Sequence, residues 1–335
     1  MTTHSIRYRT FLFFLLTNLH SQSLGWRAQL FGFADNREYD ASVQIPQSTL
    51  GVQLAPEIYL KFDSIHTLNV GLNALKEFGS TSQFDKVTPY IYYGMESNAF
   101  SFNFGVFPRK QHLGSAPRAL YYDSLYYYRP YISGLFWTYS KGAFNQSVYL
   151  DWTSRQSNFN RETFIMGGKG GFSYKMLYFE NHIYMYHHAG TAIPQEGDHL
   201  RDNGVVLLSL GINASNYTFF DTLKLSFSGI KSFERERNVS GWHSPNGVII
   251  DFSIDYKGVG MLNSFYYGQG HNLDWGDPFY RLKQYNRTDV YYKMLNFKKV
   301  SGAFTYSFHF AEGNLSHQQQ FIISVDLSSD FKSPR

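Results

Sequence analysis

The segment Leu50–Phe62, LGVQLAPEIYLKF, decides the fold because apolar and polar residues alternate along it. One face carries Leu50, Val52, Leu54, Ile58, Leu60 and Phe62, and the other carries Gly51, Gln53, Glu57, Tyr59 and Lys61. Successive side chains of a β-strand point to opposite faces. The segment therefore predicts a strand with one apolar and one polar face.

The same alternation recurs along the chain, in residues 66–74, 99–107, 223–228, 248–255, 304–310 and 320–327. Two architectures fit such strands. In a soluble sandwich or propeller the apolar faces meet in a core, whereas in a membrane barrel they face lipid and the polar faces line water. Soluble strands are typically about 5–6 residues long, but a tilted membrane strand needs about 9–11. The runs are mostly of the longer kind, which favours the barrel.

The connections between the predicted strands support this choice. We count about sixteen strands (range 14–18), joined alternately by short turns and long links. The long links are residues 36–47, 77–85, 110–131, 154–160, 190–203, 231–246, 269–288 and a shorter 311–317. Short periplasmic turns and long external loops are typical of outer-membrane barrels. The predicted fold is all-β, an antiparallel transmembrane β-barrel.

The N-terminus has the pattern of a secretory signal peptide. Basic residues, including Arg7 and Arg9, precede the short apolar run Phe11–Leu16, and small residues follow at Ser21 and Ser23. Such a run is too short to span a membrane. We predict a signal peptide over residues 1–23 and one barrel domain over residues 24–335.

Composition excludes several functions. The chain has no cysteine, so it has no thiol chemistry, and its net charge of +4 is spread out rather than clustered, which argues against nucleic-acid binding. His182, His187 and His188 lie along one predicted strand, too far apart for one ion, so we expect no metal site and no cofactor.

At this point the sequence resembles the porin-like outer-membrane β-barrels of Gram-negative bacteria. The local resemblance rests on Phe107-Pro108-Arg109, Tyr127-Tyr128-Arg129-Pro130, Asp35–Tyr39 in the first long link, and Tyr280–Tyr292. One departure is the C-terminus, where the terminal aromatic of such barrels would have to be Phe331. The resemblance implies an outer-membrane location and a third external loop that folds into the barrel and narrows it.

The third long link, residues 110–131, is the predicted constriction of a pore. The residues that we expect to set its width and charge are Arg109, Lys110, Arg118, Asp123 and Arg129. Basic rings favour anions, so a mild anion preference follows. The alternative is that these arginines bind loop carbonyls or wall carboxylates. The predicted lumen wall includes Glu57, Lys61, Lys224, Asp251 and Asp255.

The sequence does not suggest an enzyme. His243-Ser244-Pro245-Asn246-Gly247 invites comparison with outer-membrane phospholipases, which carry His-x-Ser-Asn-Gly. Here proline stands where the nucleophile would be, and a Pro-Asn-Gly turn explains the segment.

The predicted function is a porin-like channel for passive diffusion of small hydrophilic solutes across the outer membrane, with membrane lipid as the surrounding partner. The second hypothesis is a closed or plugged barrel with a structural, adhesive or partner-binding role. The third is a secreted soluble β-protein that binds carbohydrate. No sequence feature indicates the oligomeric state.

Overall fold

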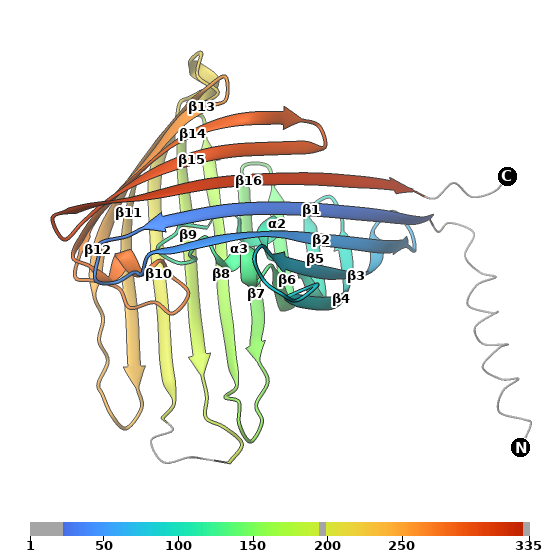
Figure 1. Ribbon diagram of the computed structural model, residues 1–335, viewed down its shortest axis with the longest axis horizontal. Coiled ribbons are helices and arrows are strands. Elements are labelled where there is room, and N and C mark those ends of the chain that lie inside the picture. Colours follow the sequence, from blue (N-terminus) through green and yellow to red (C-terminus); the bar gives the residue numbers. More distant parts are fainter. Residues whose placement is uncertain (1–22, 115, 194–198, 331–335) are drawn as a thin grey trace, which may run out of the picture.

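The chain folds into a barrel of sixteen antiparallel strands (Figure 1). The computed structural model describes residues 23–114, 116–193 and 199–330. In chain order the first strands are β1 (Ser23–Glu38), β2 (Gln47–Lys61), β3 (His66–Glu77), β4 (Lys86–Glu96), β5 (Phe100–Pro108), β6 (Tyr131–Lys141), β7 (Phe144–Ser154) and β8 (Thr163–Tyr174). The others are β9 (Leu177–His188), β10 (Arg201–Asn213), β11 (Thr222–Glu236), β12 (Asn246–Tyr256), β13 (Val259–Gly268), β14 (Gln284–Phe297), β15 (Val300–Ala311) and β16 (Asn314–Asp330).

The barrel closes because the first and last strands pair with each other. The register of β1 against β16 runs from Gly25 opposite Asp330 to Glu38 opposite His317. Each strand also pairs with its neighbours in sequence, so the sheet has no free edge. The sequence-based prediction of an antiparallel barrel of about sixteen strands is confirmed. The predicted signal peptide, apart from Ser23, and the terminal Phe331 lie outside the described residues.

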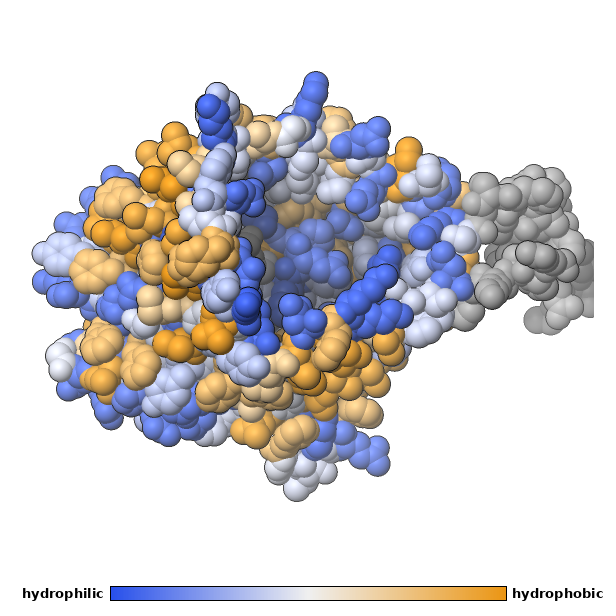
Figure 2. Space-filling view, turned by 90° about the horizontal axis from the view of Figure 1, so that it is seen from above, coloured by the Kyte–Doolittle hydropathy of each residue, from blue (hydrophilic) through white to orange (hydrophobic). Residues whose placement is uncertain are grey.

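The barrel surface is apolar outside and polar inside. Along β2 the polar residues Gln53 and Glu57 are buried, whereas Leu50, Leu54 and Ile58 are 42%, 45% and 54% exposed. This is the reverse of a soluble strand, whose apolar face is buried. A hydrophilic hollow surrounded by hydrophobic surface is visible in Figure 2. None of the helices in the described part of the chain is long and apolar enough to span a membrane.

Short turns alternate with long loops along most of the chain, as the sequence predicted. Lys175 and Lys257 have positive φ angles of 54° and 51°, as tight hairpin turns require. Four predicted long links were too long, because β1 extends to Glu38, β11 extends to Glu236, β14 begins at Gln284, and only Glu312 and Gly313 separate β15 from β16. The polar residues that follow Gly313 suggest a loop in the sequence. In the structure they form the start of β16, and their side chains point alternately to the inside and the outside of the barrel.

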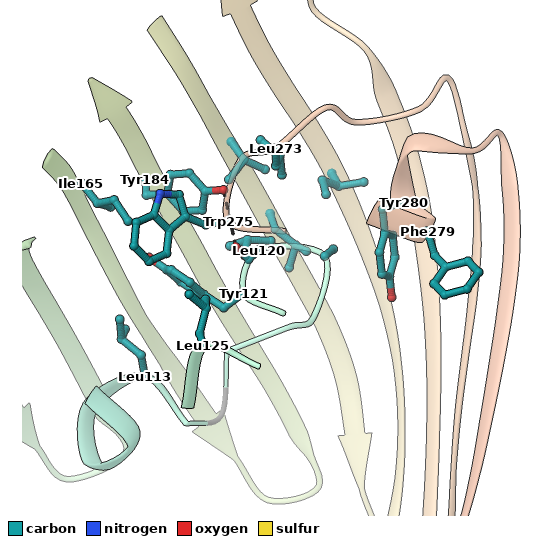
Figure 3. Packing of buried hydrophobic residues seen from close by; sticks show 14 of the residues in the cluster. Leu113, Leu120, Tyr121, Leu125, Ile165, Tyr184, Leu273, Trp275, Phe279 and Tyr280 are labelled. Carbon is teal, nitrogen blue, oxygen red and sulfur yellow. Dashed lines mark hydrogen bonds between the residues drawn. The ribbon is translucent and has the colours of Figure 1, made fainter. Parts of the chain in front are cut away.

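Two long loops enter the barrel and pack against each other. Loop L3 (109–130) carries α2 (Arg109–Leu113) and α3 (Leu125–Tyr128), and loop L7 (269–283) carries the 3₁₀ helix η2 (Pro278–Arg281). A further 3₁₀ helix, η1 (Ser215–Tyr217), lies in the connection between β10 and β11. Figure 3 shows the buried side chains of both loops beside those of the wall; the labelled residues are Leu113, Leu120, Tyr121, Leu125, Ile165, Tyr184, Leu273, Trp275, Phe279 and Tyr280. We call this inner unit the plug. The sequence pointed to L3 alone, and the inward course of L7 was missed.

Candidate functional site

Backbone contacts join the two loops of the plug. The Tyr122 amide donates to the Trp275 carbonyl (3.0 Å), and the Asp277 amide donates to the Arg118 carbonyl (2.9 Å). Gly276 lies so close to the Ala119 carbonyl that a Cβ atom would overlap it. The sequence therefore needs glycine at this position, because only a residue without a side chain permits the approach.

Arg109 anchors L3 to the barrel wall. Its guanidinium donates to the Arg129 carbonyl (2.8 Å), to the Tyr131 carbonyl (2.7 Å) and to the Asp151 carboxylate (2.6 Å). The side chains of Arg109 and Asp151 are each 2% exposed. Arg109 and Arg129 also lie over the Trp275 ring, 5.5 and 5.1 Å from its centre. Arg109 thus takes the alternative role considered from the sequence, that of binding loop carbonyls and a wall carboxylate.

Four charged side chains form a closed network between L3 and β14. Arg118 contacts Asp123 (3.1 Å) and Asp289 (3.0 Å), while Arg287 contacts Asp289 (2.7 Å) and Asp123 (3.4 Å). Burial disfavours the charged form of Asp123, but Arg118 and Arg287 outweigh it and hold the pKa of this carboxyl below its usual value. The network is neutral, and it ties the loop to the wall.

A cavity of about 330 Å³ lies beside this network. Its acidic and basic lining residues are Arg118, Asp123, Glu180, Lys224, Asp251, Arg287 and Asp289. Four of these are acidic and three are basic, so the lining has no positive excess. The cavity brings together two of the predicted loop residues and two of the predicted wall residues.

The other predicted site residues lie elsewhere. The Lys110 ammonium lies over the Phe31 ring, 4.9 Å from its centre. Glu57 pairs with Arg27 (2.9 Å), and Lys61 lies 3.7 Å from Asp330. Lys61 lines a second cavity of about 750 Å³.

The last predicted wall residue, Asp255, pairs with Lys293 (2.8 Å). The predicted site residues are therefore divided between the plug, the wall and the second cavity.

Sequence reasoning missed Arg287, Asp289 and Trp275. Arg287 lay in the predicted link 269–288. β14 begins at Gln284, several residues before the alternation of apolar and polar residues from which the strand was predicted. Trp275 is an isolated aromatic without periodic neighbours. The chain has only 5 tryptophans, and the presence of one of them in L7 was the single sequence signal for this loop.

The described residues contain no group of three or more His, Asp or Glu side chains that could hold a metal ion. They do contain one close serine–histidine pair. Ser232 Oγ lies 2.7 Å from His271 Nδ1, but both residues are buried inside the barrel, where burial lowers the pKa of His271 to about 4. This pair fastens L7 to β11.

A polar cluster faces outward where β16, β1 and β2 end at the long-loop side; we call it the rim cluster. Its members are Asn36, Glu38, Ser48, His317 and Gln319. Asn36 Nδ2 donates to Glu38 Oε1 (2.9 Å) and to Gln319 Oε1 (2.6 Å), and Ser48 Oγ donates to Asn36 Oδ1. The residues belong to the face opposite to buried Asp35, Thr49 and Gln318, and so they are polar groups on the outer surface of the barrel.

His317 is the titratable base of the rim cluster. Its Nδ1 lies 3.2 Å from the Tyr306 hydroxyl. Its ring packs at 5.7 Å against both Tyr306 and Phe308. In the register, His317 stands opposite Glu38. Its Nε2 has no hydrogen-bond partner among the residues that the structure describes, so this atom is available to a water molecule or ligand.

The fold and its polar interior define an outer-membrane β-barrel of Gram-negative bacteria. Three solved barrels are similar to it. A loop L8 deletion mutant of OmpT from Vibrio cholerae has 10% identity and a TM-score of 0.59, over 92% of this chain and 100% of that one. An anion-selective porin from Comamonas acidovorans has 13% identity and a TM-score of 0.56, over 92% and 99%. OmpF from Salmonella typhi has 9% identity and a TM-score of 0.55, over 91% and 97%. At such identities the likeness shows the fold alone, and it confirms the predicted resemblance in fold to outer-membrane barrels.

The family is more specific. A profile described as Lipid A 3'-O-deacylase-type matches residues 16–333, so the chain belongs to this family. No curated relative matches the chain in sequence. The prediction that the chain is not an enzyme is therefore wrong, because the family is one of enzymes. The sequence could not reveal this, because neither the phospholipase-like segment nor any other short motif carried the signal.

Proposed function

We propose that this barrel removes an O-linked acyl chain from lipid A in the outer leaflet of the outer membrane. The observation that carries the proposal is the family match, which spans almost the entire chain. The structure supports it in two ways. The plug packs against the inner wall of the barrel. The rim cluster puts polar groups on the outer surface at the external end, within reach of a lipid ester.

The rim cluster supplies the groups that ester hydrolysis needs. The described residues of the rim show no hydrogen-bonded serine–histidine pair, since Ser48 donates to Asn36 instead. Water is therefore the nucleophile in this proposal. Its oxygen attacks the ester carbonyl carbon while its proton passes to Nε2 of His317. The sugar oxygen then leaves with that proton, giving a free fatty acid and a lipid A hydroxyl.

The side chains around His317 act by positioning and by charge stabilisation. Tyr306 holds Nδ1, so the ring keeps one orientation, as general bases require. The Gln319 amide, whose oxygen accepts from Asn36, keeps its NH2 group as a donor that can turn towards the oxyanion that develops on the ester carbonyl. Glu38 stands opposite His317 in the register and supplies a carboxylate on the same outer face.

Mass spectrometry of lipid A tests the proposal. Refolded protein is incubated with lipid A in mixed micelles, and the expected product has lost one acyl chain. His317→Gln should reduce the rate about 10²–10⁴-fold, the usual contribution of a general base. His243→Gln, which changes an exposed histidine away from the rim, should leave the rate unchanged. Intact lipid A after incubation with folded protein would contradict the proposed activity.

The second candidate is passage of small hydrophilic solutes, favoured by the cavity beside the four-charge network. Single-channel conductance in a planar bilayer tests it, and a salt gradient tests the mild anion preference predicted from the loop basic residues. Stable open steps would support a channel. Insertion without steps would indicate that the plug closes the barrel.

A further inference from the structure

A second polar patch faces outward on a part of the barrel wall separate from the rim cluster. On β11 the exposed apolar residues Leu225 and Phe227 alternate with buried Ser226 and Ser228. The outward parity continues through Lys231, Arg235 and Arg237 towards the external end. We call these three residues the basic stripe.

One carboxylate organises the stripe. Asp202 of β10 stands opposite Arg235 in the register. It accepts two hydrogen bonds from Arg237 (2.8 and 3.0 Å) and one from Arg235 (3.0 Å). The Asp202 side chain is 5% exposed, whereas those of Arg235 and Arg237 are 30% and 42% exposed. The two guanidinium groups therefore cover the carboxylate and remain accessible themselves.

The charges do not cancel. Lys231, Arg235 and Arg237 carry three positive charges against the single negative charge of Asp202. Glu234 faces the other side, where it contacts Asn272 (3.0 Å). Arg235 Nε is buried and has no hydrogen-bond partner in the described structure. An unsatisfied buried donor of this kind costs free energy, so the patch lacks an acceptor.

Exposed aromatic residues near the basic stripe indicate its depth relative to the membrane. The Arg235 guanidinium lies 4.3 Å from the centre of the Trp242 ring, and Trp242 is 53% exposed. Trp152, 41% exposed, packs against Phe164 at 5.1 Å on the same outer surface. Exposed tryptophans gather at the interface between membrane and water. The stripe thus lies at the level of the lipid headgroups.

We propose that the basic stripe binds the phosphate groups of lipid A and holds a lipid A molecule against β9–β11. Arginine presents a planar fork that matches phosphate oxygens, and each guanidinium has donors beyond those used by Asp202. Four strands, β12–β15, separate β11 from β16 on the shorter way round the barrel. The bound molecule is therefore distinct from one at the rim cluster, and the stripe is a lipid anchor rather than part of the hydrolytic site.

Lipid binding is measured by native mass spectrometry of the refolded full chain in detergent. The probes are bisphosphorylated lipid A, the same lipid after enzymatic removal of its phosphates, and phosphatidylglycerol. His317→Gln is the background for all measurements, so that hydrolysis does not consume the probe and failure of the proposed activity does not affect the result.

The test variant is Arg235→Gln with Arg237→Gln. The matched control, Arg155→Gln with Lys299→Gln, removes the same charge from exposed positions elsewhere. We expect the stripe variant to bind bisphosphorylated lipid A at least about tenfold more weakly, the effect of losing one charge-assisted hydrogen bond. The control should bind normally, and the dephosphorylated lipid should bind both proteins weakly.

Lys231→Gln is the second variant, because Lys231 does not contact Asp202 and its loss leaves that pairing intact. It should also weaken binding if the stripe holds phosphate. Equal binding of phosphatidylglycerol would overturn the assignment to lipid A in favour of a general anionic-lipid surface. Unchanged affinity in folded stripe variants would overturn the site itself.

Discussion

Asp151→Asn should release L3 from the barrel wall. The substitution keeps the shape of the side chain but removes the charge that Arg109 faces at 2.6 Å, with both side chains 2% exposed. Breaking a buried ion pair by removing one partner costs about 3–5 kcal/mol, because the remaining charge is left uncompensated. The two carbonyl contacts of Arg109 remain, so we expect a value near the lower end.

Native-state proteolysis measures this cost directly. Trypsin cuts after Lys110 and Arg118 only when L3 opens, and the cleavage rate follows the open population. A cost of 3–5 kcal/mol should raise that rate roughly a hundredfold to a few thousandfold. The control is Asp326→Asn, which removes an exposed carboxylate held by Gln29 (2.8 Å). It should change the rate little, since exposed pairs contribute about 0–1 kcal/mol.

The outcome that would refute this reasoning is a rate of cleavage in L3 that stays at the wild-type value while Asp151→Asn remains a folded barrel. The Arg109–Asp151 pair would then not determine whether the loop stays in place.

Three further predictions follow from the same structure. Burial holds the pKa of His112 at about 4, below its ordinary value of 6.5. As pH falls, the unfolded chain therefore takes up a proton on this histidine before the folded chain does. The free energy of unfolding, measured in urea, should fall between pH 6.5 and about 4, and it should fall less in His112→Gln. An equal fall in the two proteins would contradict the prediction. Gly276→Ala should separate L7 from L3 and raise the tryptic cleavage rate, whereas Gly241→Ala, with no atom within 4 Å of the added Cβ, should not. Gln29→Cys with Asp326→Cys, opposite each other across the β1–β16 seam, should form a disulfide in this cysteine-free chain and give a mobility shift on non-reducing gels; no shift after oxidation would contradict the register.

The architecture was visible in the sequence because it depends on local alternation. Leu50, Leu54 and Ile58 already define the outer face of β2, and period-2 patterns reveal a strand without any knowledge of its partners. The polar start of β14 was missed for the converse reason. The residues before Val290 carry no regular apolar alternation, so Arg287 and its role in the charge network were hidden inside a predicted loop.

The candidate sites were less accessible to sequence reasoning because they depend on pairing between distant segments. The rim cluster joins Asn36 with Gln319 (2.6 Å), and this contact exists only because the first and last strands close the barrel. The inward packing of Trp275 against Arg109 and Arg129 likewise depends on the tertiary course of two loops. Charge alone suggested an open arginine-lined constriction, whereas the structure pairs Arg109 with Asp151 and Arg118 with Asp123 and Asp289.

The plug has a consequence for the order of assembly. Its two halves, L3 and L7, are separated by more than a hundred residues, so neither can reach its final contacts until the strands on both sides are in place. Before that moment the apolar wall residues Val205 and Leu207, both almost fully buried in the finished barrel, would face water. Docking of the two loops therefore stabilises only the complete barrel. A partly folded barrel lacks these contacts and gains no stability from them. The loops thus make the last stage of folding all-or-none, and a stalled chain exposes the apolar part of the inner wall that the plug would cover.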